Sequence, residues 1–157
     1  MKTIIEMASR IADLERRLDG MMRHGTVAEV DPEAGTARIS IGGTDEKPFI
    51  SPWVPYGQIA GALKVHSPPS VGQQMTLLSP SGDFRQAVAL PMTWSNQNAS
   101  PSSKGDENVL TFGSIKVELR GTEIIITAPR VFFKCDGTTL EMKGGSFRAS
   151  SDDFEFD

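Results

Sequence analysis

The chain has 157 residues and a formal net charge of −4 at pH 7, and 38% of its residues are hydrophobic. This length predicts one or two small domains. The basic residues are scattered, which argues against nucleic acid as a partner because binding to phosphates requires clustered positive charge. Cys135 is the single cysteine, so no intrachain disulfide can form, and we expect it to pack in or near a turn.

The sequence also bears on where the protein is made. No run of about 18 apolar residues is present, so we expect no membrane-spanning helix. The N-terminus lacks the charged and then apolar pattern of a secretory signal. These features predict a protein that is made in the cytoplasm and has no membrane anchor.

Residues 1–23 contain a predicted helix, which extends over residues 3–22 and is free of Gly and Pro before Gly20. Its apolar residues are spaced alternately 3 and 4 apart, the a/d heptad pattern of a coiled coil. They are Ile4, Met7, Ile11, Leu14, Leu18 and Met21. Arg10 at a g position and Glu15 at the next e position suit an interchain ion pair. We expect a short coiled coil or a docking helix; the alternative is an amphipathic helix that lies on its own domain.

Residues 24–92 form a second predicted domain made of short strands. These strands cover residues 25–31, 36–42, 74–79 and 84–90, with a further short strand after Pro52. The turns between them contain Gly, Pro and Asp, and the prolines near Trp53 suit an edge strand. Short strands, such turns and a long central connection are typical of a Greek-key barrel of the OB type.

Residues 93–107 are mostly small and polar, which is typical of a linker. Trp94 is the exception, and we expect it to pack on the barrel. Residues 108–157, which we call the shaft segment, alternate apolar and polar residues in short bursts separated by Gly-containing turns. One sheet of such strands cannot cover its own apolar face, so the sequence predicts that identical chains cover one another.

The alternation also predicts which side chains of the shaft segment point toward the shared interior. They are Ile115, Val117, Leu119, Ile124, Ile126, Val131, Phe133, Leu140, Met142 and Phe147. Their polar neighbours carry charges of both signs and are expected to face water. No apolar belt for contact with lipid is visible among these outward residues, so a shaft of this kind would cross a bilayer only if it were driven.

The order of helix, barrel and strand stack resembles the baseplate assembly protein V family, the central spike proteins of contractile-tail phages. Relatives of that family include the valine-glycine repeat spikes of type VI secretion. The resemblance lies in residues 25–32, 37–41, 53–55 and 71–86. It implies a mainly β homotrimer with an OB domain at the baseplate end and an intertwined triple-stranded β-helix. It also implies assembly with baseplate hub and wedge proteins in the virion tail, and puncture of the outer membrane on sheath contraction.

Family members that end in their own sharpened apex carry a His-x-His pair near the C-terminus, where three chains bind an iron ion. The histidines here, His24 and His66, form no such pair, so the sequence predicts no tip iron and no other cofactor. Phe154, Phe156 and Asp157 lie at the end of the sequence. If the phenylalanines point inward, we expect a separate tip protein of the PAAR type to cap them; the alternative is that they close the core themselves.

Three other functions compete with that of a spike. An enzyme is not expected, because two isolated histidines and one cysteine offer no pairing of a nucleophile with a base. A binding module of the OB type would use aromatic side chains such as Phe49, Trp53, Tyr56 and Phe84, but its basic partners are sparse. A baseplate adaptor without a piercing role is compatible with the same sequence.

Overall fold

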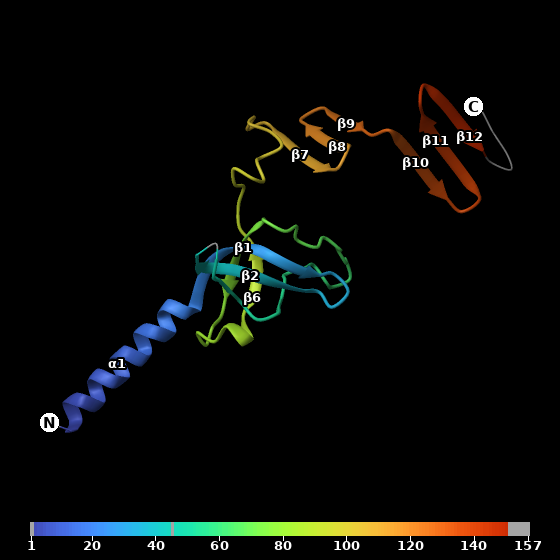
Figure 1. Ribbon diagram of the computed structural model, residues 1–157. Helices are drawn as coiled ribbons and strands as arrows, with labels where there is room; N and C mark the ends of the chain where they lie inside the picture. Colours follow the sequence, from blue (N-terminus) through green and yellow to red (C-terminus); the bar gives the residue numbers. More distant parts are fainter. Residues whose placement is uncertain (1, 45, 151–157) are drawn as a thin grey trace. The chain divides into compact units, whose positions relative to one another are not determined.

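The computed structural model describes residues 2–44 and 46–150 (Figure 1). Within these ranges the chain has one α-helix, one short 3-10 helix and twelve strands. The chain folds into two compact units, Met1–Ala99 and Ser100–Asp157, so the boundary lies inside the predicted linker of residues 93–107. In the described part of the chain, no helix is both long enough and apolar enough to cross a membrane.

The first unit consists of a helix followed by a barrel of short strands. Its elements are α1 (Lys2–Met21), β1 (Met22–Asp31), β2 (Thr36–Gly43), β3 (Pro48–Ile50), β4 (Val54–Pro55), β5 (Gln74–Leu78), the 3-10 helix η1 (Phe84–Gln86) and β6 (Val88–Pro91). The strands are hydrogen-bonded in the order β3-β2-β1-β5-β6, and β4 also pairs with β2. The helix therefore spans almost the residues predicted for it, and β1 follows it without a linker.

The sheet closes on itself through a contact between the end of β4 and β6. Tyr56 forms a parallel bridge with Ala89, and the Gly57 amide donates to the Ala89 carbonyl at 2.8 Å. Because β4 pairs with β2 and this bridge reaches β6, the strands form a ring. Closure satisfies backbone groups that would otherwise form exposed sheet edges.

The barrel contains the hydrophobic core of the first unit. Its buried side chains are Val27, Ala37, Ile39, Val54, Tyr56, Met75, Leu77, Ala87 and Ala89. Buried and less buried residues alternate along β2 and β5, as a strand with one face on the core requires. The buried Ser51 hydroxyl accepts a hydrogen bond from the Ile39 amide at 2.9 Å and donates to the Pro52 carbonyl at 2.8 Å, so this polar group is satisfied.

Local hydrogen bonds explain one turn that was predicted correctly and one strand that was predicted too long. The Asp31 carboxylate accepts from the amides of Glu33 and Ala34 at 3.1 and 3.0 Å, which fixes the turn of the predicted β1–β2 hairpin. The strand predicted over residues 84–90 is wrong in its first half. There the Asp83 carboxylate accepts from the Arg85 amide at 2.9 Å and caps η1, so β6 begins only at Val88.

The prediction that Trp94 packs on the barrel is only partly correct. The side chain lines a surface pocket together with Gln74 and Met92, yet 65% of its surface is exposed. Just beyond it, the Ser95 amide donates to the Asn98 carbonyl at 2.9 Å, and the Asn98 side-chain amide donates to the Gly72 carbonyl at 3.1 Å, so this turn contacts the barrel surface rather than its core.

The second unit contains two separate three-stranded antiparallel sheets, one of β7-β8-β9 and the other of β10-β11-β12. The elements are β7 (Glu107–Phe112), β8 (Ile115–Arg120), β9 (Glu123–Thr127), β10 (Arg130–Cys135), β11 (Thr138–Lys143) and β12 (Ser146–Ser150). Gly144 and Gly145 have φ of 54° and 76° in the β11–β12 turn, a conformation that favours glycine. Both sheets are open, and their strands are hydrogen-bonded to strands of the same chain. The expected intertwined β-helix would therefore require further copies.

Candidate assembly surfaces

The register of the β7-β8-β9 sheet places most of its apolar residues on one face. Val117 lies opposite Leu110 on one side and Ile126 on the other, and Ile115 pairs with Phe112. This apolar face consists of Leu110, Phe112, Ile115, Val117, Leu119, Ile124 and Ile126. The predicted interior of the shaft segment omitted Leu110 and Phe112, although β7 shows the same alternation as β8.

The second sheet repeats this arrangement. Val131 lies opposite Met142, Phe133 lies opposite Leu140, and Met142 also pairs with Phe147. These five residues form the apolar face of the β10-β11-β12 sheet. All ten predicted interior residues of the shaft segment therefore lie on one or other of the two apolar faces. Cys135 is exposed on this second face, at the end of β10 beside a turn.

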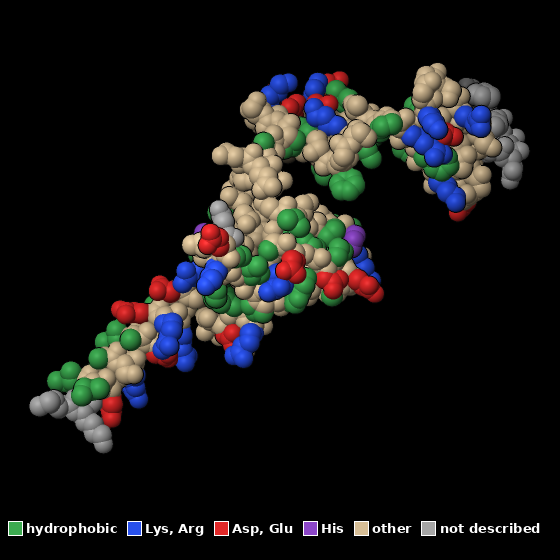
Figure 2. Space-filling view, viewed as in Figure 1, with side chains coloured by type: hydrophobic (Ala, Val, Ile, Leu, Met, Phe, Trp, Pro, Cys, Tyr) green, Lys and Arg blue, Asp and Glu red, His purple; other side chains and the backbone are tan. Residues whose placement is uncertain are grey.

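Neither apolar face is covered by other residues of the described ranges, 2–44 and 46–150. Phe112 is 85% exposed, Ile124 is 70% exposed and Phe147 is 68% exposed. No hydrophobic side chain of residues 100–150 is buried, whereas the barrel has a complete core. Contiguous exposed apolar surface of this kind marks a site of interaction with another protein, a membrane or a ligand. The second unit thus has the residues of a core without the layer that would enclose it (Figure 2).

The opposite face of the first sheet carries a network of charges that pair with one another, although the buried Arg120 Nε has no hydrogen-bond partner within the described residues. Glu118 is 7% exposed, and its carboxylate lies 3.1 Å from Lys116 Nζ and 2.8 Å from Arg120 Nη2. Arg120 also pairs with Glu107 and Glu123 at 3.3 and 3.4 Å. Hydrogen bonds from Lys116 and then Arg120 hold the pKa of Glu118 below its usual value. The pKa of Arg120 is raised, chiefly by its hydrogen bond to Glu118.

Acidification is expected to weaken the β7-β8-β9 sheet through Glu118. Folding lowers the pKa of this carboxyl from 4.5, so its ionised form stabilises the folded state. This stabilisation is complete above pH 4.5 and is lost as the pH falls through the pKa of the folded state. Glu118→Gln should therefore lower the thermal stability of the sheet at neutral pH, and the difference from the parent should shrink at about pH 3. Glu33→Gln, in an exposed barrel turn, is the matched control. An equal loss of thermal stability by Glu118→Gln at both pH values would contradict this role of Glu118.

The six apolar residues predicted for helix association lie along α1 and are exposed. Ile4 is 71% exposed and Leu18 is 65% exposed, and Met21, at the barrel end, retains 37%. Met7, Ile11 and Leu14 are exposed in the same way. The alternative in which this face of the helix lies on its own domain is therefore wrong. Asp13 pairs with Arg16 and Arg17 on another side of the helix, at 2.7 and 3.2 Å.

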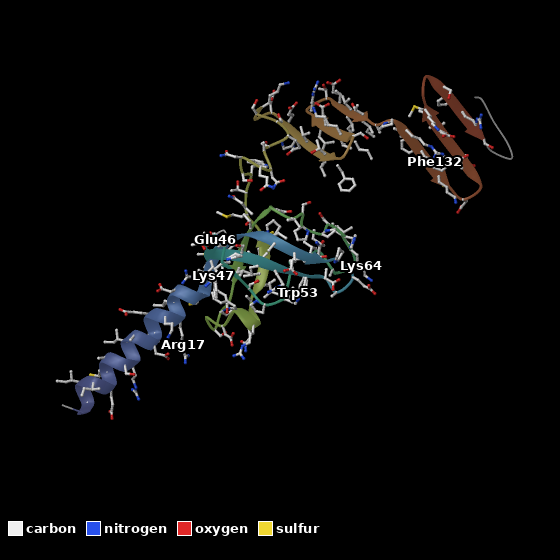
Figure 3. The ribbon with its side chains drawn as sticks, viewed as in Figure 1. Arg17, Glu46, Lys47, Trp53, Lys64 and Phe132 are labelled. Carbon is white, nitrogen blue, oxygen red and sulfur yellow. The ribbon has the colours of Figure 1, made fainter. Side chains whose placement is uncertain are left out.

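The aromatic residues of the barrel do not form a basic binding platform. Tyr56 belongs to the core, and Phe84 packs against it. Trp53 is 47% exposed beneath the Arg38 guanidinium, which lies 5.9 Å from the ring centroid (Figure 3). That guanidinium is already engaged, because Arg38 donates to Glu29 at 2.9 Å and to the Ser51 carbonyl at 3.2 Å. The guanidinium nearest to Trp53 is therefore not free to bind a phosphate backbone.

The tip residues predicted from the sequence, Phe154, Phe156 and Asp157, lie outside the described residues. Across residues 2–44 and 46–150, no group of three or more His, Cys, Asp or Glu side chains is placed to hold a metal ion. His24 Nδ1 lies 3.0 Å from the Thr76 hydroxyl, in the β1–β5 pairing. His66 lies in the connection between β4 and β5.

The first unit is thus a closed barrel, and the second consists of two sheets whose apolar faces are uncovered. Residues 23–94 match the family model described as the type VI secretion system/phage-baseplate injector OB domain. The chain is also 33% identical over 99 residues to the spike protein of Escherichia phage P2. That alignment covers 62% of this chain and 44% of the relative, so it spans less than half of that protein. The barrel is therefore similar to the phage-baseplate injector OB domains, and the chain is similar over part of its length to a phage spike protein.

Proposed function

We propose that the chain is the structural central spike of a contractile phage tail or tailocin, and that it works as a homotrimer. The observation that carries this proposal is the pair of uncovered apolar faces in the second unit. A chain with a complete core at one end and core residues without a covering layer at the other is suited to self-association. Copies that turn these faces toward a common axis would form an intertwined triple-stranded β-helix.

The magnitude of the apolar burial favours association. Burying a Val, Leu, Ile, Phe or Met side chain contributes roughly 1.5–3 kcal/mol. The two faces together supply twelve such side chains per copy. Several of them are already partly buried in the single chain, so the gain is smaller than twelve full burials, but it is of the same order as the cost of association, on the order of 4–15 kcal/mol. The charges on the other face of the first sheet pair with one another, so that face would remain in water.

A shaft of this construction fits mechanical work better than catalysis. Its outward side chains carry both charges and would not partition into lipid, so it would cross an outer membrane only when driven by sheath contraction. In this proposal the barrel docks to baseplate hub and wedge proteins, and the shaft meets the host membrane transiently. A separate PAAR-like tip protein is a further partner in this proposal.

The experiment examines contractile-tail particles purified from the source that encodes this chain. Antibody against the barrel should label the baseplate end of each particle in electron micrographs. Particles carrying a truncation after Lys104 should lose killing or infection even where the barrel is retained in the baseplate. If the truncated particles remained fully active, the chain would be an adaptor without a piercing role. If the chain were absent from the particles, the proposal would fail.

A further inference from the structure

The exposed side chains of α1 form a continuous seam rather than isolated apolar residues. The a positions are Ile4, Ile11 and Leu18, and the d positions are Met7, Leu14 and Met21. Each retains between 37% and 71% of its surface exposed. A seam repeating every seven residues matches the spacing at which two or more helices pack side by side in a left-handed coiled coil. Figure 2 shows hydrophobic side chains along this helix.

The contact between α1 and the barrel leaves this seam free. Gly20 is buried, and a Cβ placed there would lie 2.6 Å from the Gly82 carbonyl oxygen. A Cβ on Gly82 would in turn lie 2.6 Å from the Arg17 carbonyl oxygen. The Ser79 amide donates to the Met21 carbonyl at 2.8 Å, which ties the same turn to the end of the helix. The barrel thus holds α1 from the side of Arg17 and Gly20, which are not a or d positions.

Charge on the flanks of the seam indicates which partner fits it. Arg10 occupies a g position and Glu15 the following e position, the pair that meets between parallel, in-register helices. Neither side chain has an ion pair or a side-chain hydrogen bond within the described chain, whereas Asp13, Arg16 and Arg17 pair among themselves. Within one helix, residues five apart point about 140° away from each other, so Arg10 and Glu15 cannot satisfy each other in the same copy.

We propose that α1 is a parallel, in-register coiled-coil interface between copies of this chain. The interface rests on the self-association proposed above, but it uses other residues at the other end of the sequence. Because the Gly20–Gly82 contact ties the helix to the barrel, pairing of the helices would also hold neighbouring barrels in a common orientation. A helix of about three heptads is short for an independent coiled coil, so it needs such tethering.

Disulfide formation in the full chain tests the register. In a Cys135→Ser background, Ile11→Cys places one thiol at an a position, where parallel in-register helices bring equivalent residues together. Ser9→Cys, at an f position on the outer side, is the matched control. Mild oxidation should link Ile11→Cys copies extensively and leave Ser9→Cys copies unlinked.

Equal linking of the two variants in an oligomer of normal mass would overturn the helix interface while leaving the proposed trimer intact. A monomer in every variant would instead refute the self-association on which both proposals rest.

The charge pair gives a second, independent measurement on the same background. Arg10→Glu should reduce the linked fraction of Ile11→Cys, because it places like charges at facing g and e positions. Adding Glu15→Arg should restore the linked fraction, since the opposite charges then meet again between copies. If the double change linked no better than Arg10→Glu alone, the parallel register would be wrong. Linking by antiparallel helices is distinguished in the same way, because it would not bring Arg10 opposite Glu15.

Discussion

Ile126→Lys is expected to abolish self-association of the full chain. Ile126 lies on the apolar face of the β7-β8-β9 sheet, opposite Val117. A lysine there would carry its ammonium group into the proposed interior, at a cost of several kcal/mol in every copy unless the charge is paired. Every copy carries the change, so this cost is incurred once per copy in each oligomer. Sedimentation velocity should show the mass falling from about three times 17.0 kDa to that of one chain.

The adjacent residue supplies the matched control. Ile125 is the same residue type on the same strand, but it faces the other side of the sheet, opposite Glu118. Ile125→Lys therefore adds a positive charge beside an existing carboxylate and in contact with water. We expect this variant to keep the mass of the parent. Loss of association in both variants, or in neither, would show that the two faces of the sheet are not distinguished as we describe.

Leu77→Ala is expected to destabilise the barrel by about 2–5 kcal/mol, the usual cost of truncating a fully buried leucine. Leu77 lies on β5 and has 0% of its surface exposed, among core residues that include Ile39 and Met75. The barrel is small and has few other apolar contacts to compensate, so a loss of this size is a large part of its stability. Chemical denaturation followed by the fluorescence of the two tryptophans, Trp53 and Trp94, would measure the change.

Leu78→Ala is the neighbouring control. Leu78 retains 39% of its surface exposed, so its truncation removes less buried area and leaves no enclosed cavity. We expect its midpoint of denaturation to stay close to that of the parent. Equal destabilisation by the two changes would place the barrel core elsewhere than in the alternating inward residues of β5.

Periodicity made much of this architecture predictable. The alternation in the shaft segment predicts which face of a sheet each apolar side chain occupies, because successive side chains of a strand point to opposite sides. Ile124 and Ile126 could therefore be placed on one face before any pairing was known. The 3 and 4 spacing indicated the helix and its seam in the same way. Turn residues marked most strand ends, since glycine and Asp-Gly pairs are favoured where φ is positive.

Features that depend on contacts between distant residues were not predicted. The ring closure of the barrel needs Tyr56 beside Ala89, and nothing local to either residue signals that pairing. The approach of Gly20 to Gly82 is equally non-local. The capping of η1 by Asp83 is local, but the apolar residues that follow it resemble a strand. The number of copies in the oligomer is not encoded in alternation either, because an apolar face indicates that a partner is needed but not how many.

The central claim is that the second unit acquires an interior only when copies of the chain surround it. Sedimentation velocity of the full chain at micromolar concentration, combined with limited proteolysis, tests this claim most directly. The account predicts a trimer in which residues beyond Lys104 resist cleavage, and loss of that protection when Ile126→Lys separates the copies. A folded monomer whose residues beyond Lys104 are equally protected would contradict it.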